Sequence, residues 1–286
     1  MLKRNPVAWG FVGIPLAWLM IFFITPLVLM AVYSLRPDMR GGLFTLGWTP
    51  TLQHYETILD NRDYLRLLWI SLRTAFVIAS ISTLLAYPLA YFLAFRVQKR
   101  RSLLLVLLLL PFWTSYLLRI IAWKIILGSN GFLNNILLDL RLINEPSTIL
   151  LYSRWAVIVT LVYVWLPFVA LPIYAALQRV DRSLLEAAAI LGAPPPLVFW
   201  RVTLPLSLPG VIAGFFMVFI PTVGEYVTPL LVGGSRGSLY GNIIATFFGQ
   251  GLNWPLGAAL ALIMLITVLG LLAILSRFID LRRFLD

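Results

Sequence analysis

The chain has 286 residues, a formal net charge of +11, 61% hydrophobic residues and 12% charged residues. Soluble globular chains are only about 45–50% apolar and about 25% charged, so this composition excludes an ordinary water-soluble protein and indicates an integral membrane protein. Cysteine is absent and His54 is the only histidine, which excludes disulfides, thiolate sites and histidine clusters. We therefore expect no metal and no cofactor, and we expect His54 to be a surface histidine.

Six apolar stretches are long enough to cross a bilayer core of about 30 Å, which requires about 20 helical residues. In chain order they are Val7–Tyr33, Leu68–Phe95, Leu103–Leu127, Trp155–Leu177, Leu206–Val232 and Pro255–Phe278. The sequence therefore predicts an all-α integral membrane protein with six transmembrane helices. A further apolar segment, Phe132–Leu140, is expected to form a short interfacial helix between the third and fourth spans.

The basic residues indicate how the spans are oriented. With six spans, both termini lie on the same side as the loops that follow the second and fourth spans. That side carries Lys3 and Arg4 and the tight cluster Arg96–Arg101, and short loops rich in Lys and Arg stay in the cytoplasm. We expect a multi-pass protein of the bacterial cytoplasmic (inner) membrane with both termini cytoplasmic. The same arginines explain the net charge, so no nucleic-acid partner is expected.

The loop between the fourth and fifth spans contains the signals of a short helix. Ser183 and Glu186 have the spacing of a capping box, which predicts a helix that begins at Leu184. Gly192 suits a left-handed C-cap, and Pro194–Pro196 prevent continuation. A helix of about two turns is not stable alone in water. Its small alanine face fits a knob that seats in a partner's groove, or an ordinary loop helix lying on the membrane surface.

This loop resembles the EAA loop of binding-protein-dependent ABC importer permeases. The positions that carry the resemblance are Glu186, Ala187, Ala188, Gly192, Val202, Leu204 and Pro205. The one departure is Val202, where the family has isoleucine. The resemblance implies the type I ABC importer transmembrane fold and an ATPase-coupling loop whose helix, Leu184–Gly192, docks on an ATPase subunit.

The same resemblance implies a set of partners and a domain layout. The partners are two cytoplasmic ATP-binding subunits, a second homologous permease subunit, an extracytoplasmic substrate-binding protein and membrane lipid. The chain itself has no GxxxxGK[ST] phosphate loop, so ATP hydrolysis is expected on a separate subunit and the chain is not expected to be an enzyme. We expect a first helix and outer segment over 1–67, a type-1 transmembrane domain over 68–278 with its coupling loop at 181–205, and a cytoplasmic tail at 279–286.

Further segments resemble the spermidine/putrescine permease branch of this family: Leu110–Tyr116 with Arg119, Gly128–Asn134, Gly224–Pro229, Gly233–Gly234 and Asn253–Ala258. The resemblance implies the import of a small organic solute, above all a polyamine such as spermidine or putrescine. The alternative is a secondary transporter or channel that does not depend on an ATPase. That alternative fits less well, because proton relays generally use several intramembrane ionisable groups.

The candidate substrate path contains one acid and three aromatic residues. Glu225 is the only acid well inside a predicted span, and acids there default to a functional role, so a cationic amine could pair with it. The alternatives are a structural pair with Arg119 or Lys124, and a span end shallow enough to be in contact with water. The aromatic candidates are Trp113, Tyr116 and Tyr163. Their faces suit ammonium groups, although aromatic residues near span ends more often belong to an interfacial belt or to packing.

Overall fold

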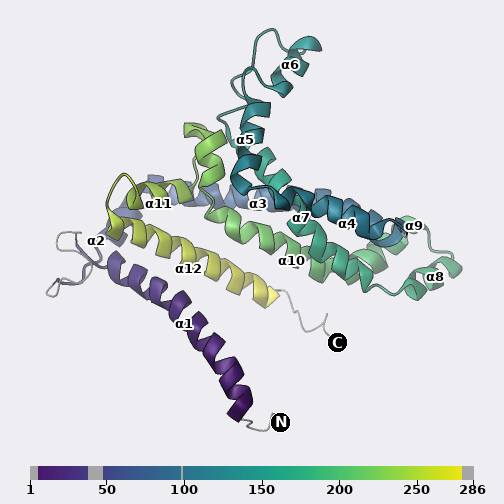
Figure 1. The fold of residues 1–286 in the computed structure, drawn as a ribbon, viewed down its shortest axis with the longest axis horizontal. Helices are drawn as coiled ribbons and strands as arrows, with labels where there is room; N and C mark the ends of the chain where they lie inside the picture. The colour runs from purple at the N-terminus through teal and green to yellow at the C-terminus, as the bar shows by residue number, and fades with distance from the viewer. Residues whose placement is uncertain (1–5, 38–47, 98, 279–286) are drawn as a thin grey trace. The chain divides into compact units, whose positions relative to one another are not determined.

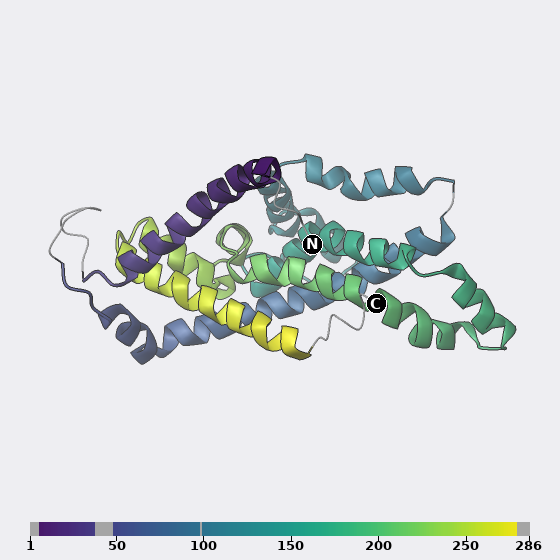
Figure 2. The same ribbon diagram turned by 90° about the horizontal axis from the view of Figure 1, so that it is seen from below.

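The structure is a computed structural model that describes residues 6–37, 48–97 and 99–278. The expected tail at 279–286, together with Lys3 and Arg4, lies outside the described residues. All regular secondary structure in the described residues is helical (Figure 1 and, from below, Figure 2). The α-helices are α1 (Pro6–Ser34), α2 (Gln53–Asp60), α3 (Arg62–Tyr91), α4 (Arg101–Leu109), α5 (Tyr116–Leu127), α6 (Phe132–Asp139), α7 (Arg154–Gln178), α8 (Arg182–Ile190), α9 (Pro195–Val198), α10 (Leu204–Val223), α11 (Tyr240–Phe248) and α12 (Trp254–Phe278).

Six helical segments of the described chain are long and apolar enough to span a membrane. They are Gly13–Ser34, Arg62–Arg96, Tyr116–Asp139, Arg154–Gln178, Pro195–Val223 and Trp254–Leu275. The predicted all-α architecture with six transmembrane helices is confirmed, and the predicted short helix after Gly131 is present as α6.

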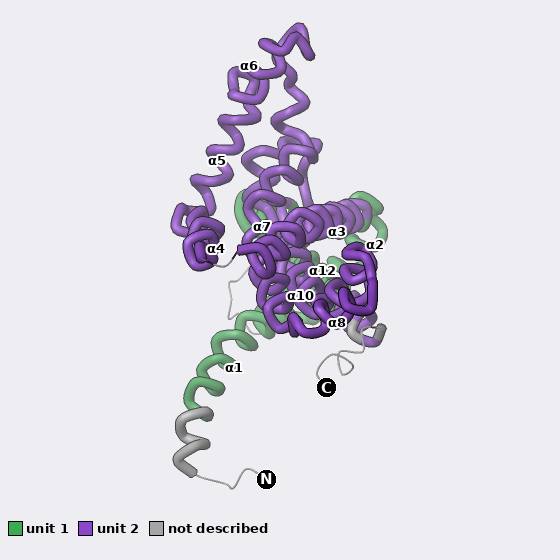
Figure 3. Tube along the Cα trace, turned by 90° about the vertical axis from the view of Figure 1, so that its right-hand side faces the viewer, with its two compact units in different colours: residues 1–65, 243–270 green, residues 66–242, 271–286 purple. Residues whose placement is uncertain are grey.

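The trace divides into two compact units (Figure 3). One unit comprises residues 1–65 and 243–270, and the other comprises residues 66–242 and 271–286. The first unit contains α1, α2, most of α11 and the larger part of α12. The second contains α4 to α10 and nearly all of α3, and it holds both candidate functional sites.

Helices α7 and α10 lie side by side and form the core of the second unit (Figure 1). Two glycines one turn apart on α10 bring the backbones together. A Cβ atom at Gly210 would lie 2.5 Å from the carbonyl oxygen of Pro172, and one at Gly214 would lie 3.0 Å from Val169 Cγ1. Small residues at this spacing allow membrane helices to pack closely. The close pair α7 and α10 therefore forms a scaffold for the loop that contains α8 and α9 at one end and for the turn after α10 at the other.

The third predicted span, Leu103–Leu127, is not one continuous helix. The structure divides it into α4, a 3₁₀ turn over Leu110–Trp113, and α5. Pro111 has no N–H to continue the helical hydrogen bonds, and Thr114 is extended (φ −90°, ψ 148°). The Thr114 hydroxyl donates a hydrogen bond of 2.7 Å to the Pro111 carbonyl oxygen, which satisfies an acceptor that the break exposes.

The expectation for His54 was wrong, because this residue is buried, with 8% of its surface exposed. Its ring nitrogen Nε2 lies 2.8 Å from the carbonyl oxygen of Arg36. His54 and the fully buried Ile58 are four residues apart and so share one face of α2. The neighbouring Tyr55 hydroxyl donates a 2.7 Å hydrogen bond to Ser34 Oγ at the end of α1. These contacts hold α2 against the end of α1 within the first unit.

Candidate functional site

The predicted short helix of the loop between the fourth and fifth spans is present as α8. It begins two residues earlier than predicted from the capping box, because Asp181 and not Ser183 is the N-cap. The Asp181 carboxylate accepts a 2.9 Å hydrogen bond from the backbone N–H of Ser183. This hydrogen bond lowers the pKa of the Asp181 carboxyl below its ordinary value, since it stabilises the ionised form.

The helix ends as the sequence predicts. Gly192 has a φ of +79°, in the left-handed region that favours glycine. The Gly192 N–H donates to the Ala189 carbonyl oxygen and the Ala193 N–H donates to the Ala188 carbonyl oxygen, each at 3.0 Å. This pair of hydrogen bonds is the Schellman pattern, and α9 then begins at Pro195, where a proline needs no N–H partner.

The surface of α8 is exposed and partly apolar. None of its residues is buried, and Ile190 and the adjacent Leu191 are each 86% exposed. The two signature residues Glu186 and Ala187 are exposed as well, whereas Ala188 is half-buried. Figure 2 shows α8 and α9 projecting together beyond the ends of α7 and α10. The loop therefore presents large apolar side chains that its own chain does not cover.

The second half of the loop signature lies where α9 runs into α10. Val202 belongs to a π-helical turn over Phe199–Thr203, and Leu204 and Pro205 are the first residues of α10. All three signature residues are half-buried. Continuous helical backbone from α9 to α10 thus connects the exposed loop to the core helix pair.

The fifth predicted span ends before Glu225. Helix α10 stops at Gly224 (φ −89°, ψ 5°), and the chain then turns, so Leu206–Val232 is not one helix. Glu225 is half-buried in this turn, where its Oε1 accepts a 3.0 Å hydrogen bond from the backbone N–H of Thr228. The structure describes Glu225, Arg119 and Lys124, and no ion pair joins the carboxylate to either cation. The carboxylate therefore caps the next helical turn and forms no ion pair with either of these cations.

Tyr116 connects α5 to this turn. Its hydroxyl lies 2.9 Å from Oγ1 of the fully buried Thr228, whose backbone N–H donates to the Glu225 carboxylate. One helical turn further along α5, the guanidinium carbon of Arg119 lies 5.8 Å from the centre of the Tyr116 ring and 5.3 Å from that of Phe112. The acid, the hydroxyls and the aromatic faces thus form one polar cluster, which we call the Glu225 cluster.

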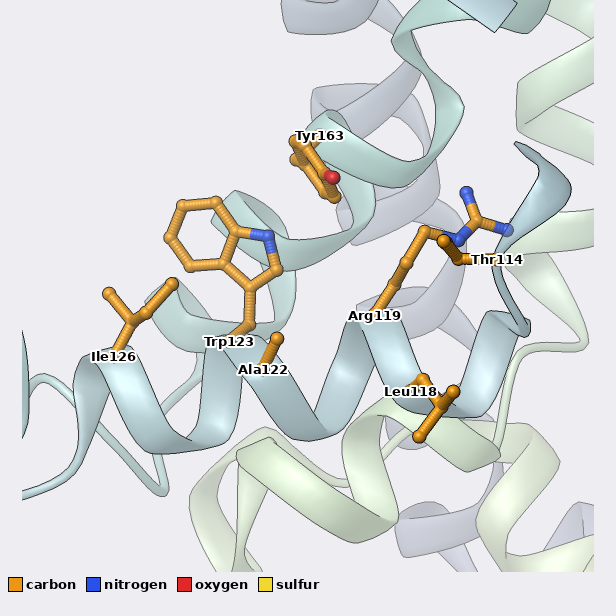
Figure 4. A pocket seen from close by; sticks show the side chains of 7 residues that line it. All are labelled: Thr114, Leu118, Arg119, Ala122, Trp123, Ile126 and Tyr163. Atoms are coloured by element: carbon orange, nitrogen blue, oxygen red, sulfur yellow. The ribbon is translucent and has the colours of Figure 1, made fainter. Parts of the chain in front are cut away.

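A cavity of about 390 Å³ lies on the other side of Arg119, between α5 and α7 (Figure 4). Its walls are mainly apolar, and Trp123 of α5 and Tyr163 of α7, which both line it, make an edge-to-face contact with ring centres 5.6 Å apart. Arg119 lines the cavity, and its Nε is buried without a hydrogen-bond partner among the described residues. Trp113 is 82% exposed and does not line the cavity.

The structure therefore brings Tyr116 and Glu225 together, places Tyr163 in the adjacent cavity and leaves Trp113 apart. Sequence reasoning missed Thr228 and Trp123. Thr228 follows Glu225 by three residues, which is the spacing between an N-cap side chain and the N3 backbone N–H that it accepts. Trp123 follows Tyr116 by seven residues and so lies on the same helical face. Both residues could have been identified from these spacings.

The fold is that of a polytopic helical membrane protein, with an exposed helical loop and an acid-bearing turn. The family described as "Binding-protein-dependent transport system inner membrane component" matches residues 86–284. The chain belongs to this family. It is a multi-pass inner-membrane permease component of an ABC transport system, and not an enzyme.

Relatives with known names agree with this assignment over nearly the whole chain. The chain is 39% identical to the spermidine/putrescine transport system permease protein PotB of Haemophilus influenzae, over 88% of this chain and 86% of that protein. It is 38% identical to the PotB protein of Escherichia coli K12, over 89% of this chain and 91% of that protein. Among solved structures, a bacterial alginate ABC transporter in complex with an alginate pentasaccharide-bound periplasmic protein has the same fold. The TM-score is 0.72 and the sequence identity is 16%, over 100% of this chain and 97% of that chain.

Proposed function

We propose that the chain is the permease subunit of an ATP-driven importer that carries a polyamine such as spermidine or putrescine across the cytoplasmic membrane. The names of the PotB relatives support this solute class. The structural observation that most supports a cationic substrate is the Glu225 cluster. A half-buried carboxylate without a cationic partner, beside the hydroxyl and ring of Tyr116, suits an ammonium group.

The proposed substrate path runs past Glu225 and Tyr116 and includes Tyr163, while Trp113 would contact the solute from the exposed end of the broken third span. Arg119 beside Tyr116 adds a positive charge that disfavours a second ammonium group close to the first. A linear polyamine would therefore bind with one terminal ammonium at Glu225 and its other amines directed away from Arg119.

We propose that α8 is the coupling helix and lies on the cytoplasmic side, with both termini. Its 86% exposed Ile190 and Leu191 support a protein partner, because exposed apolar patches mark interaction sites. The expected partners are two ATP-binding subunits, a second homologous permease and an extracytoplasmic binding protein. The alginate transporter of the same fold is in complex with a periplasmic protein, which supports the last of these. We retain 68–278 as the type-1 transmembrane domain.

In this proposal, movement of α8 by the ATPase subunits reaches the Glu225 cluster through α10. Helix α10 has 20 residues, so it extends over about 30 Å. One of its ends continues into α9 and the loop, and the other ends at the turn that holds Glu225. A displacement at the loop is thus transmitted to the cluster along one helix.

Purification of the tagged chain from its native membrane in a mild detergent, followed by mass spectrometry of the associated proteins, tests the assembly. We expect a nucleotide-binding ATPase and a second six-span permease. A chain that purifies alone and moves solute in vesicles without ATP would favour the secondary transporter instead.

A further inference from the structure

A second cavity lies within the second unit, where four helical segments end or begin. It has a volume of about 220 Å³ and is bordered by Phe95, Arg101, Leu177, Gln178 and Arg182, among others. Phe95 is near the end of the helix that continues α3, Arg101 begins α4, Leu177 and Gln178 end α7, and Arg182 begins α8. Because α3 and α7 belong to membrane spans that end here, the cavity lies at a boundary between hydrocarbon and water.

Two arginines give this pocket a positive charge. The guanidinium carbon of Arg101 lies 4.9 Å from the centre of the Tyr174 ring, and its nitrogens donate to the Gln178 side-chain oxygen when that amide is oriented with its oxygen toward Arg101. These contacts hold Arg101 in place. Across the described chain, no carboxylate forms an ion pair with Arg101 or Arg182, and the nearby Asp181 carboxylate accepts the N–H of Ser183. The pocket therefore presents two cationic donors to an anion.

An apolar strip begins directly beside the pocket. No residue of α4 is buried, and Leu103, Leu107 and Leu110 are 55%, 51% and 49% exposed. Their spacing of four and three residues places them on one face. This strip starts two residues after Arg101 and extends along the helix away from the pocket. A ligand that fits both features has an anionic head and a long apolar tail.

We propose that the pocket binds the headgroup of an anionic phospholipid whose acyl chains lie along the exposed face of α4. Arginine is well suited to phosphate oxygens, and basic pockets between membrane helices are typical sites for anionic headgroups. The cavity volume is several times the roughly 30 Å³ that one water molecule occupies, which leaves room for a phosphate group. Assignment to the cytoplasmic leaflet rests on the orientation proposed above, whereas the preference for an anionic headgroup does not.

A headgroup bound in this pocket would connect helix α8 to helix α4. Arg182 is the first residue of α8, and Arg101 is the first residue of α4. A phosphate that accepts hydrogen bonds from both arginines joins the two helix starts. Occupancy of the pocket thus holds the exposed helix α8 in a defined position relative to the membrane.

The test measures lipid retained by the purified, assembled transporter after reconstitution in mixed phosphatidylglycerol and phosphatidylcholine and washing in detergent. We expect selective retention of phosphatidylglycerol, reduced about fivefold by Arg182→Gln and again by Arg101→Gln. The matched control is Arg179→Gln, which removes an exposed charge at the same end of α7 but does not line the pocket; it should retain the lipid. Arg101→Lys keeps the charge and should retain most of the binding.

Three results would overturn the proposal. The first is equal retention of phosphatidylglycerol by the pocket variants and by Arg179→Gln. The second is displacement of the bound signal by inorganic phosphate in solution, which would identify a free-anion site. The third is loss of the ATPase subunit from Arg182→Gln with lipid retention unchanged, which would make the pocket part of the protein interface. Lipid retention is measured without transport, so a wrong solute assignment leaves this test unaffected.

Discussion

The hydroxyl oxygen of Tyr116 lies 2.9 Å from Oγ1 of Thr228, a residue 112 positions later in the chain. Thr228 also donates its backbone N–H to Glu225. The position of the Glu225 carboxylate therefore depends on α5 as well as on the turn that follows α10. Because α5 begins after the break at Pro111, that break places Tyr116 at the start of a helix that faces the acid.

Glu225→Gln tests the charge of the carboxylate and leaves its geometry intact, because the glutamine carbonyl oxygen can still accept the N–H of Thr228. We expect polyamine uptake at limiting substrate to fall about tenfold, since hydrogen bonds to charged groups contribute about 1.5–3 kcal/mol. The matched control is Glu145→Gln, the same change at an exposed residue, which should leave uptake unchanged. Uptake kinetics of Glu225→Gln that equal those of the unaltered protein would assign the acid a capping role alone.

Gly192→Trp tests the docking loop. A Cβ at Gly192 would meet no atom within 4 Å in its own chain, so the new side chain projects outward, and the left-handed backbone adds about 1–2 kcal/mol of strain. We expect the variant to insert in the membrane but to hydrolyse ATP without substrate uptake. Gly192→Asn, which tolerates this conformation, should keep most of the uptake. Unchanged uptake by Gly192→Trp contradicts the docking role.

Gly210→Leu tests the contact between α7 and α10. The added Cβ would lie 2.5 Å from both the Pro172 carbonyl oxygen and Ala176 Cβ, and overpacking typically costs about 1–3 kcal/mol. We expect a lower Tm of the purified complex. Gly270→Leu is the control, because a Cβ there has no neighbour within 4 Å. Equal Tm values for the two variants would show that the close approach does not contribute to stability.

Asp181 makes the first turn of α8 sensitive to acid. Its pKa is lowered in the folded protein, so its stabilising effect is complete above its unfolded pKa of about 4 and is lost as the pH falls through the lower folded value. The chain has no cysteine, so a spin label at Leu184→Cys reports this turn alone. We expect label mobility to increase on acidification, and Asp181→Asn, which cannot titrate, to lack that increase. An identical pH profile in both proteins would contradict the capping role.

Part of this architecture can be predicted from the sequence because it depends on interactions between residues that are close together in the chain. Long apolar runs predict six spans, and Gly192 with the following prolines predicts the end of α8. The break at Pro111 is harder to predict, because membrane helices tolerate proline: Pro15 and Pro26 remain inside α1. At Pro111 the backbone N–H and the hydroxyl of Thr114 both donate to the Pro111 carbonyl oxygen, which keeps this carbonyl paired where the helix breaks.

Contacts between distant segments could not be predicted in this way. The partner of Gly210 is the backbone at Pro172, and the partner of Thr228 is Tyr116, neither of which a spacing rule connects. The burial of His54 could not be predicted for the same reason, because its ring contacts the carbonyl oxygen of Arg36, 18 residues earlier in the chain. The Glu225 residue was identifiable as an unusual acid, but its place in a turn and not within a helix required the structure.

ATP-dependent uptake of labelled spermidine into proteoliposomes that contain the purified complex tests the central claim most directly. We predict uptake that requires both the binding protein outside and hydrolysable ATP at the side of α8, and that Gly192→Trp abolishes. Uptake that proceeds without ATP and follows an imposed ion gradient would contradict the account.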